Sequence, residues 1–137
     1  MIVVDTNVVL DLFVFSDPAC APLRQVLETG QRRWIATLPM REELTRVLSY
    51  SKIIPRLAFY QLSADEVLAQ FDRFAHLVPV APRASVRCAD PDDQCFIDLA
   101  VQHQALLLSK DGAVLSMRKR LVEYGVHAQN AIELIAN

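Results

Sequence analysis

The sequence has 137 residues, of which 53% are hydrophobic, and its net charge at pH 7 is −2. Length and apolar content predict one domain over residues 1–137 with a substantial core, which excludes a disordered chain. The slightly acidic balance excludes a polycation that binds nucleic acid over its whole surface. The three cysteines lack the spacing of a zinc site, and the sequence contains no targeting segment or transmembrane run. We therefore expect a cytoplasmic protein with reduced thiols and no membrane partner.

In the first half of the chain, apolar runs alternate with capping and turn residues. The run 2–4 predicts a buried strand that ends at Asp5, and 34–37 predicts a second strand. Prolines near first turns and the pair Thr29-Gly30 mark the helix boundaries. The elements expected here are a strand at 2–5, helices at 7–14 and from 17 to about 29, a strand at 34–37, a helix opened by Pro39 and a short helix at 52–61.

The second half opens with a capping box, in which Ser63 and Glu66 precede an apolar helical pattern. A proline within 77–80 places that strand at a sheet edge, whereas the continuous apolar run 105–109 is typical of a central parallel strand. The elements expected here are a helix after Ser63, an edge strand at 77–80, a loop at 81–89, a helix from Asp90 to about Gln104, a strand at 105–109, a helix to Tyr124, a short strand at 126–128 and a C-terminal helix.

Strands that alternate with helices predict an α/β fold, a three-layer sandwich in which helices flank a mainly parallel central sheet. Right-handed crossovers bring the carboxyl ends of parallel strands to one edge of the sheet. Binding sites of such sheets form beyond this edge. Polar residues that directly follow strands are therefore the first candidates for a functional site.

Four carboxylates are expected to meet at that edge. Asp5 ends the first strand, and Asp111 follows the apolar run 105–109. Asp93 lies in the first turn of the helix before that run, and Glu43 lies in the first turns of the helix after the second strand. Carboxylates crowded in one cleft repel each other, and a divalent cation relieves the repulsion. An all-oxygen set suits Mg²⁺ or Mn²⁺ rather than Zn²⁺, and such an ion activates water for phosphodiester hydrolysis.

Each of these acids also has a purely structural interpretation. Asp5 and Asp90 are good helix caps, with Pro91 at the first helical position in the second case. Asp93 can complement a helix dipole, and Asp111 before a glycine can form a strand-to-helix turn. Asp98, five residues beyond Asp93, fits a surface or supporting position better than a primary ligand. The joint placement of the four acids, rather than any one of them, favours a site.

Four segments of the chain resemble, in the same order, motifs of the PIN domain family. The first two are VVDTNVVLDLF, which resembles the opening strand and Asp-Thr-Asn of PIN domains, and the helical pair Glu43-Leu44. The other two are DPDDQCFIDLA and ALLLSKDGAVL, which resemble the acidic helix start and the closing strand of the branch that contains toxins of toxin–antitoxin systems (VapC-like ribonucleases).

The resemblance implies a metal-dependent endoribonuclease, the toxin of a toxin–antitoxin module, whose products carry a 5′-phosphate. By the family pattern, Asp5 is a direct metal ligand, while Glu43, Asp93 and Asp111 are direct or water-mediated ligands in the same catalytic quartet. The residues implied to support the site, by hydrogen bonds or by capping, are Thr6, Asn7, Ser109 and Asp90. An antitoxin partner and a homodimer are also implied. The chain departs from the pattern at Ala113, where many relatives carry a second acid.

An acidic cleft needs a basic rim to bind RNA. Such a rim contacts backbone phosphates without reading sequence, and a narrow cleft admits single-stranded or looped RNA more easily than a duplex. An equally good interpretation of the basic run at 118–120 is a solvated helix face. The candidate rim residues are Lys110, Arg118, Lys119 and Arg41, together with Arg120, Arg46, Lys52 and Arg56.

Two other functions compete with the nuclease. A phosphatase of the haloacid dehalogenase type also begins with a strand that ends in aspartate, but it needs a second aspartate two residues later, where this chain has Asn7. A non-catalytic RNA-binding or protein-binding module would have no use for buried acids, which are costly to fold. Metal binding separates the second alternative from an enzyme.

Overall fold

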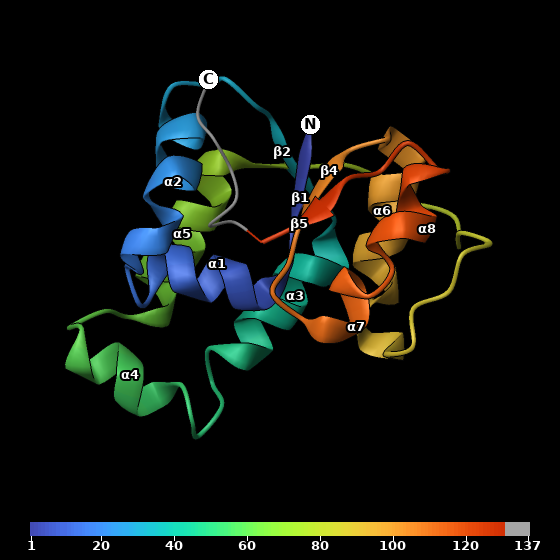
Figure 1. The fold of residues 1–137 in the computed structure, drawn as a ribbon. Coiled ribbons are helices and arrows are strands. Elements are labelled where there is room, and N and C mark those ends of the chain that lie inside the picture. Colours follow the sequence, from blue (N-terminus) through green and yellow to red (C-terminus); the bar gives the residue numbers. More distant parts are fainter. Residues whose placement is uncertain (131–137) are drawn as a thin grey trace.

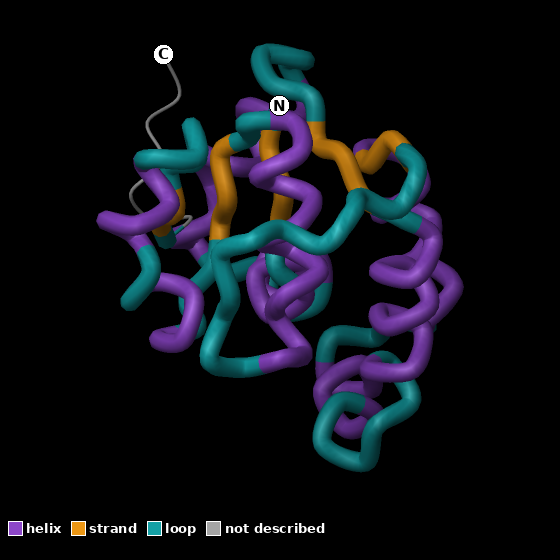
Figure 2. The backbone as a smooth tube through the Cα atoms, turned by 90° about the vertical axis from the view of Figure 1, so that its right-hand side faces the viewer, coloured by secondary structure: helices purple, strands orange, loops and turns teal. Residues whose placement is uncertain are grey.

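The computed structural model describes residues 1–130 and contains a parallel sheet of five strands in the order β3-β2-β1-β4-β5 (Figure 1). The strands run side by side through the middle of the molecule, with helices on either side (Figure 2). The three-layer α/β fold expected from the sequence is therefore confirmed. The strands are β1 (Ile2–Val4), β2 (Trp34–Ala36), β3 (Ala75–Leu77), β4 (Leu106–Leu108) and β5 (Ala128–Gln129).

Local sequence explains where most helices begin. Asp5 and Asp111 cap α1 and α7 with their side chains, and the capping box of Ser63 and Glu66 starts α5. No helix within residues 1–130 has the length and apolarity needed to cross a bilayer. The helices are α1 (Thr6–Phe13), α2 (Ala21–Glu28), α3 (Leu38–Val47), α4 (Ile54–Phe59), α5 (Ala64–Phe74), α6 (Gln94–His103), α7 (Gly112–Leu115) and α8 (Arg118–Val122), with the 3₁₀ turns η1 (Pro18–Cys20) and η2 (Pro91–Asp93).

The central strands β1 and β4 set the position of the site. All their residues except the partly buried Leu106 are buried, and Ile2 pairs with Leu106 while Val4 pairs with Leu108. One step beyond this register, the amide of Asp5 donates to the carbonyl of Leu108 at 2.9 Å. The residues that follow the two strands are therefore held side by side at the carboxyl edge of the sheet.

Three sequence-based boundaries are wrong. The third strand spans Ala75–Leu77 rather than 77–80; the amide of Val78 still donates to Ala36 at 2.8 Å, but Pro79 has no N–H to continue the pairing. The single helix expected up to Tyr124 is two helices, α7 and α8, separated at Ser116, whose hydroxyl donates to the carbonyl of Ala113. The last strand lies at 128–129 instead of 126–128. The expected C-terminal helix falls outside the described residues.

Candidate functional site

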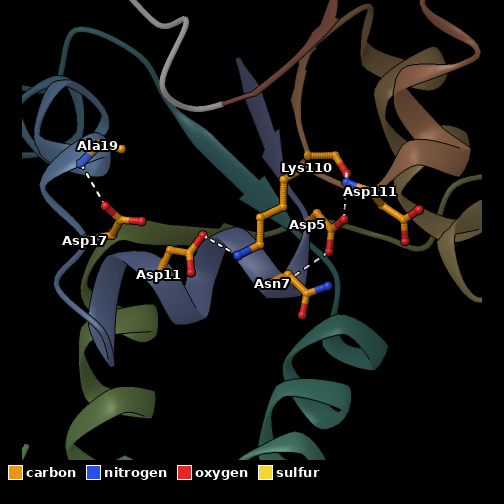
Figure 3. Close-up of polar contacts among 8 residues, drawn as sticks. Asp5, Asn7, Asp11, Asp17, Ala19, Lys110 and Asp111 are labelled. Atoms are coloured by element: carbon orange, nitrogen blue, oxygen red, sulfur yellow. Dashed lines mark hydrogen bonds and ion pairs between the residues drawn. The ribbon is translucent and has the colours of Figure 1, made fainter.

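Asp5 both caps a helix and lies within the candidate site. Its carboxylate is only 3% exposed. One oxygen, Oδ1, accepts from the amide of Asn7 at 3.1 Å (Figure 3). The other, Oδ2, accepts from the hydroxyl of Ser109 at 2.7 Å. Burial raises the pKa of Asp5, although these two hydrogen bonds oppose the rise. Asp5 therefore caps α1 and lies in the candidate site with one and the same side-chain position.

Ser109 links the ends of β1 and β4. Its side chain is fully buried, and its hydroxyl donates to Asp5 and accepts from the amide of Asp111 at 3.1 Å. A single hydroxyl therefore fixes the orientation of Asp5 and the backbone that carries Asp111. Since both strand ends are already aligned by sheet pairing, this part of the site is rigid.

A second group of carboxylates lies beside Asp5. Asp90, Asp93 and Asp111 each place one carboxylate oxygen within 4.8 Å of the other two. Asp90 caps η2 by accepting from the amide of Asp92 at 3.0 Å, and Asp111 accepts from the amide of Ala113 at 2.8 Å. Asp93 is buried, and its Oδ2 has no hydrogen-bond partner within the part of the chain that the structure describes. An unpaired, buried acceptor is costly unless a proton or a cation meets it.

Electrostatic interactions link Asp5 and Glu43 to the group of three carboxylates. Burial, together with the nearby carboxylates of Asp111 and Asp5, raises the pKa of Asp93 to about 7. Burial also raises the pKa of Glu43, with Asp5 adding to the rise and Arg46 opposing it. The donors are all carboxylate oxygens, which fits a hard divalent cation such as Mg²⁺ or Mn²⁺. A cation would relieve the repulsion that otherwise holds protons on these acids.

Of the four acids expected from the sequence, Asp93 and Asp111 lie in the carboxylate group. Asp5 lies close enough to raise the pKa of Asp93, and Glu43 lies near Asp5. Glu43 comes from α3 and is half-buried, and it senses the charge of Asp5. Thr6 is buried in the first turn of α1, while Asn7 is exposed and contributes its backbone amide. Asp98 lies outside the carboxylate group, because it accepts from the amide of Ala84 at 2.8 Å.

The sequence identified Asp90 as a helix cap and supporting residue and left open whether it shares in metal binding. The structure places it within the carboxylate group as well, through the tight turn of η2. The loop before it is tied to α6: Gln94 accepts from the amide of Cys88 at 2.7 Å and donates to the carbonyl of Val86 at 3.0 Å. Sequence reasoning missed Gln94, because no motif marks a side chain that holds a loop.

Three of the candidate rim cations contact other parts of the protein. Arg41 makes a double hydrogen bond with Asp72 at 2.7 and 2.8 Å, and Arg118 donates to the carbonyl of Ala128 at 2.8 Å. Lys110 reaches from the end of β4 to Asp11 on α1 at 2.7 Å and lies beside Asp5 and Asp111 (Figure 3). Lys119 is exposed. Of Arg41, Arg118, Lys110 and Lys119, Lys110 is therefore the cation that lies next to Asp5 and Asp111.

Comparison with known proteins agrees with this geometry. A family model described as PIN domain matches residues 1–111, a span that runs from β1 through β4 and includes all four expected acids. No curated protein matches the chain closely enough to count as a relative. PIN domains are generally nucleases, and they use divalent metal ions.

Proposed function

The chain belongs to the PIN domain family, and from this premise we propose that it is a metal-dependent endoribonuclease, the toxin of a toxin–antitoxin module. The observation that carries the proposal is the buried Asp93, whose Oδ2 has no hydrogen-bond partner among the described residues and which shares the carboxylate group with Asp90 and Asp111. Family membership favours a nuclease over the phosphatase alternative. We include in the proposal a single nuclease domain over residues 1–137 that acts in the cytoplasm.

Each acid has a distinct part in the proposed site. Asp93, Asp111 and Asp5 would hold a Mg²⁺ or Mn²⁺ ion, with Glu43 and Asp90 at its side, directly or through water. The ion, when bound, supplies an activated water and neutralises charge on the phosphate. Ser109 keeps the carboxylate of Asp5 in one orientation through its 2.7 Å hydrogen bond. Hydrolysis forms a bond between the water oxygen and phosphorus and breaks the bond to the 3′-oxygen, which leaves a 5′-phosphate.

RNA and an antitoxin are the partners that this function requires. Lys110 and Lys119 are the proposed contacts to backbone phosphates. Lys110, Arg41 and Arg118 would first have to leave their present partners. Helix α4 projects from the carboxyl-edge side of the sheet in both views (Figures 1 and 2). It exposes Phe59 and Ile54, which supports α4 as a surface for the antitoxin or for a second copy in a homodimer.

Titration of Mn²⁺ into the purified protein, followed by calorimetry, tests the metal site. We expect saturable binding to the unmodified protein and a loss of at least about tenfold in affinity for Asp5→Asn and Asp93→Asn. Asp65→Asn, an exposed acid in the first turn of α5, is the matched control and should bind as the unmodified protein does. Cleavage of RNA with 5′-phosphate products should disappear in the same two variants. Equal, weak Mn²⁺ binding by all four proteins would instead support the non-catalytic module.

A further inference from the structure

A pocket of about 320 Å³ adjoins the carboxylate site. Glu43, one of the four expected acids, forms part of its wall, and so does Asp92, which directly precedes Asp93 in the chain. One side comes from α3 and the turn that follows it, and the other side comes from η2 and the start of α6. Its volume lies at the lower end of the range for small-ligand pockets, about 300–1,000 Å³.

The side chains of this pocket combine an aromatic ring, an apolar floor and one cation. Tyr50 is 53% exposed, Met40 is only 6% exposed, and Pro39 adds a further apolar surface. The backbone of Tyr50 is fixed between α3 and α4, because its amide donates to Val47 and its carbonyl accepts from the amide of Ile53 at 2.9 Å. The ring is thus presented from an ordered turn.

The charges of the pocket restrict its ligand. Arg46 lies close enough to Glu43 to lower the pKa of that carboxyl, and it makes no ion pair within residues 1–130. The acids Glu43 and Asp92 face the same space. A neutral planar group can enter between them, whereas a phosphate is better placed near Arg46 or at the adjoining metal site.

We propose that this pocket binds the base of an unpaired nucleotide next to the phosphodiester that is cleaved, with the base stacked on Tyr50. The inference rests on the proposed nuclease function and names its substrate class, which is single-stranded RNA. Aromatic rings in RNA-binding proteins stack on bases that have left a helix, and such stacking tolerates every base. A base inside a duplex cannot reach the pocket without first being extruded. The arrangement therefore selects unpaired RNA at the point of cleavage.

Binding of a short single-stranded RNA that contains 2-aminopurine tests the pocket. We would use Asp5→Asn as the background, so that binding is read without cleavage. Tyr50→Ala should weaken binding about tenfold and remove the quenching of 2-aminopurine that stacking causes, while Tyr50→Phe should keep both. Tyr60→Ala is the matched control, because Tyr60 is also partly exposed but packs on Phe59 and Phe15 outside the pocket.

The outcomes separate this inference from the nuclease proposal. Equal RNA affinity and equal quenching for Tyr50→Ala and Tyr60→Ala would overturn the base pocket, even if Mn²⁺ binding and cleavage follow the acids. A change of oligomeric state in Tyr50→Ala, measured by sedimentation with unchanged RNA affinity, would also overturn it and assign the ring to a protein contact. A perfect duplex of the same sequence should bind more weakly and should not respond to the Tyr50 substitution.

Discussion

The two ends of the parallel sheet carry opposite charges in different surroundings. At the carboxyl end, Asp5 and Asp93 are buried among other acids. At the amino end, Arg32, Arg33 and Arg73 line a pocket of about 480 Å³ around the starts of β2 and β3. These three arginines are exposed, and none of them makes an ion pair with a described residue. A net charge of −2 therefore conceals a strong separation of charge along the strands.

The contrast teaches that burial, rather than charge, distinguishes a candidate reactive site. Exposed guanidinium groups remain hydrated, and Arg73 even rests on the ring of Phe74, with 4.7 Å from the guanidinium carbon to the ring centroid. The acids at the carboxyl end are not hydrated in this way. Burial is the main reason that the pKa values of Asp5, Glu43 and Asp93 rise. Groups that destabilise the metal-free fold in this way are candidates for a function that offsets the cost.

The largest effect should come from Asp93→Asn, which keeps the shape of the side chain and removes its charge. We expect RNA cleavage to fall by roughly 1,000-fold or more, because the buried ligand oxygen loses its charge. The metal-free variant should be more stable than the unmodified protein at pH 8, since an amide avoids the cost of a buried anion. Cleavage rates and urea unfolding measure the two effects, and a variant that is both active and less stable would contradict the comparison.

The next effect is a pH dependence of the metal-free protein. Folding raises the pKa of Asp93 from its ordinary value of 3.8 to about 7, so the folded state binds this proton more tightly than the unfolded chain. Its contribution to stability is present below about pH 4 and is lost as the pH rises through 7. In EDTA we expect the Tm to fall between pH 5 and pH 8, on the order of 5 °C.

Two additions sharpen this measurement. Saturating Mn²⁺ should remove most of the fall, because the ion replaces the proton as the partner of the carboxylates. Asp93→Asn should flatten the profile in EDTA, whereas the exposed Asp65→Asn should leave it unchanged. A metal-free protein whose Tm rises steadily from pH 5 to pH 8 would show that the buried acids do not govern its stability.

A smaller effect is expected for Ser109→Ala, which removes the hydroxyl between Asp5 and the amide of Asp111. The free energy of unfolding should fall by about 1–2 kcal/mol, because buried partners lose hydrogen bonds. Burial already raises the pKa of Asp5, and the loss of the opposing hydrogen bond raises it further. Cleavage should fall about tenfold at pH 7 and partly recover at higher pH. A pH–rate profile identical to that of the unmodified protein would argue against this positioning.

The smallest effect is expected at the amino end. Arg73→Ala removes an exposed cation and its stacking on Phe74, so the free energy of unfolding should change by no more than about 0.5–1 kcal/mol. Cleavage and Mn²⁺ affinity should be unchanged, because the substitution is at the opposite end of the strands. If Arg73→Ala impaired cleavage as much as Ser109→Ala, the two ends would not be functionally separate.

Much of the fold and the meeting of the acids follows from the sequence because both depend on regular geometry. The apolar runs at 2–4 and 106–108 read as buried parallel strands, and parallel pairing places Asp5 and Ser109 next to each other. Likewise, Asp111 follows β4 closely enough that its position hardly depends on side-chain packing. The strand order therefore accounts for the placement of Asp5 and Asp111 at one edge of the sheet, while the metal-binding roles of the four acids stay a prediction.

Side-chain contacts between residues that are distant in the sequence could not be predicted from the sequence. Arg41 selects Asp72, 31 residues away, and Arg118 selects a backbone carbonyl of β5. Asp90 joins the carboxylate group only because a 3₁₀ turn and the contacts of Gln94 hold its loop. No local pattern encodes such contacts, since they arise after elements that are distant in the sequence have packed together.

The shortness of β3 limits how copies of this protein can associate. The strand has three residues at the margin of the sheet, and Pro79 follows it without an N–H group to donate. An incoming strand from another molecule would find few backbone groups to bond there, so cross-chain sheet extension and fibre growth from this margin are disfavoured.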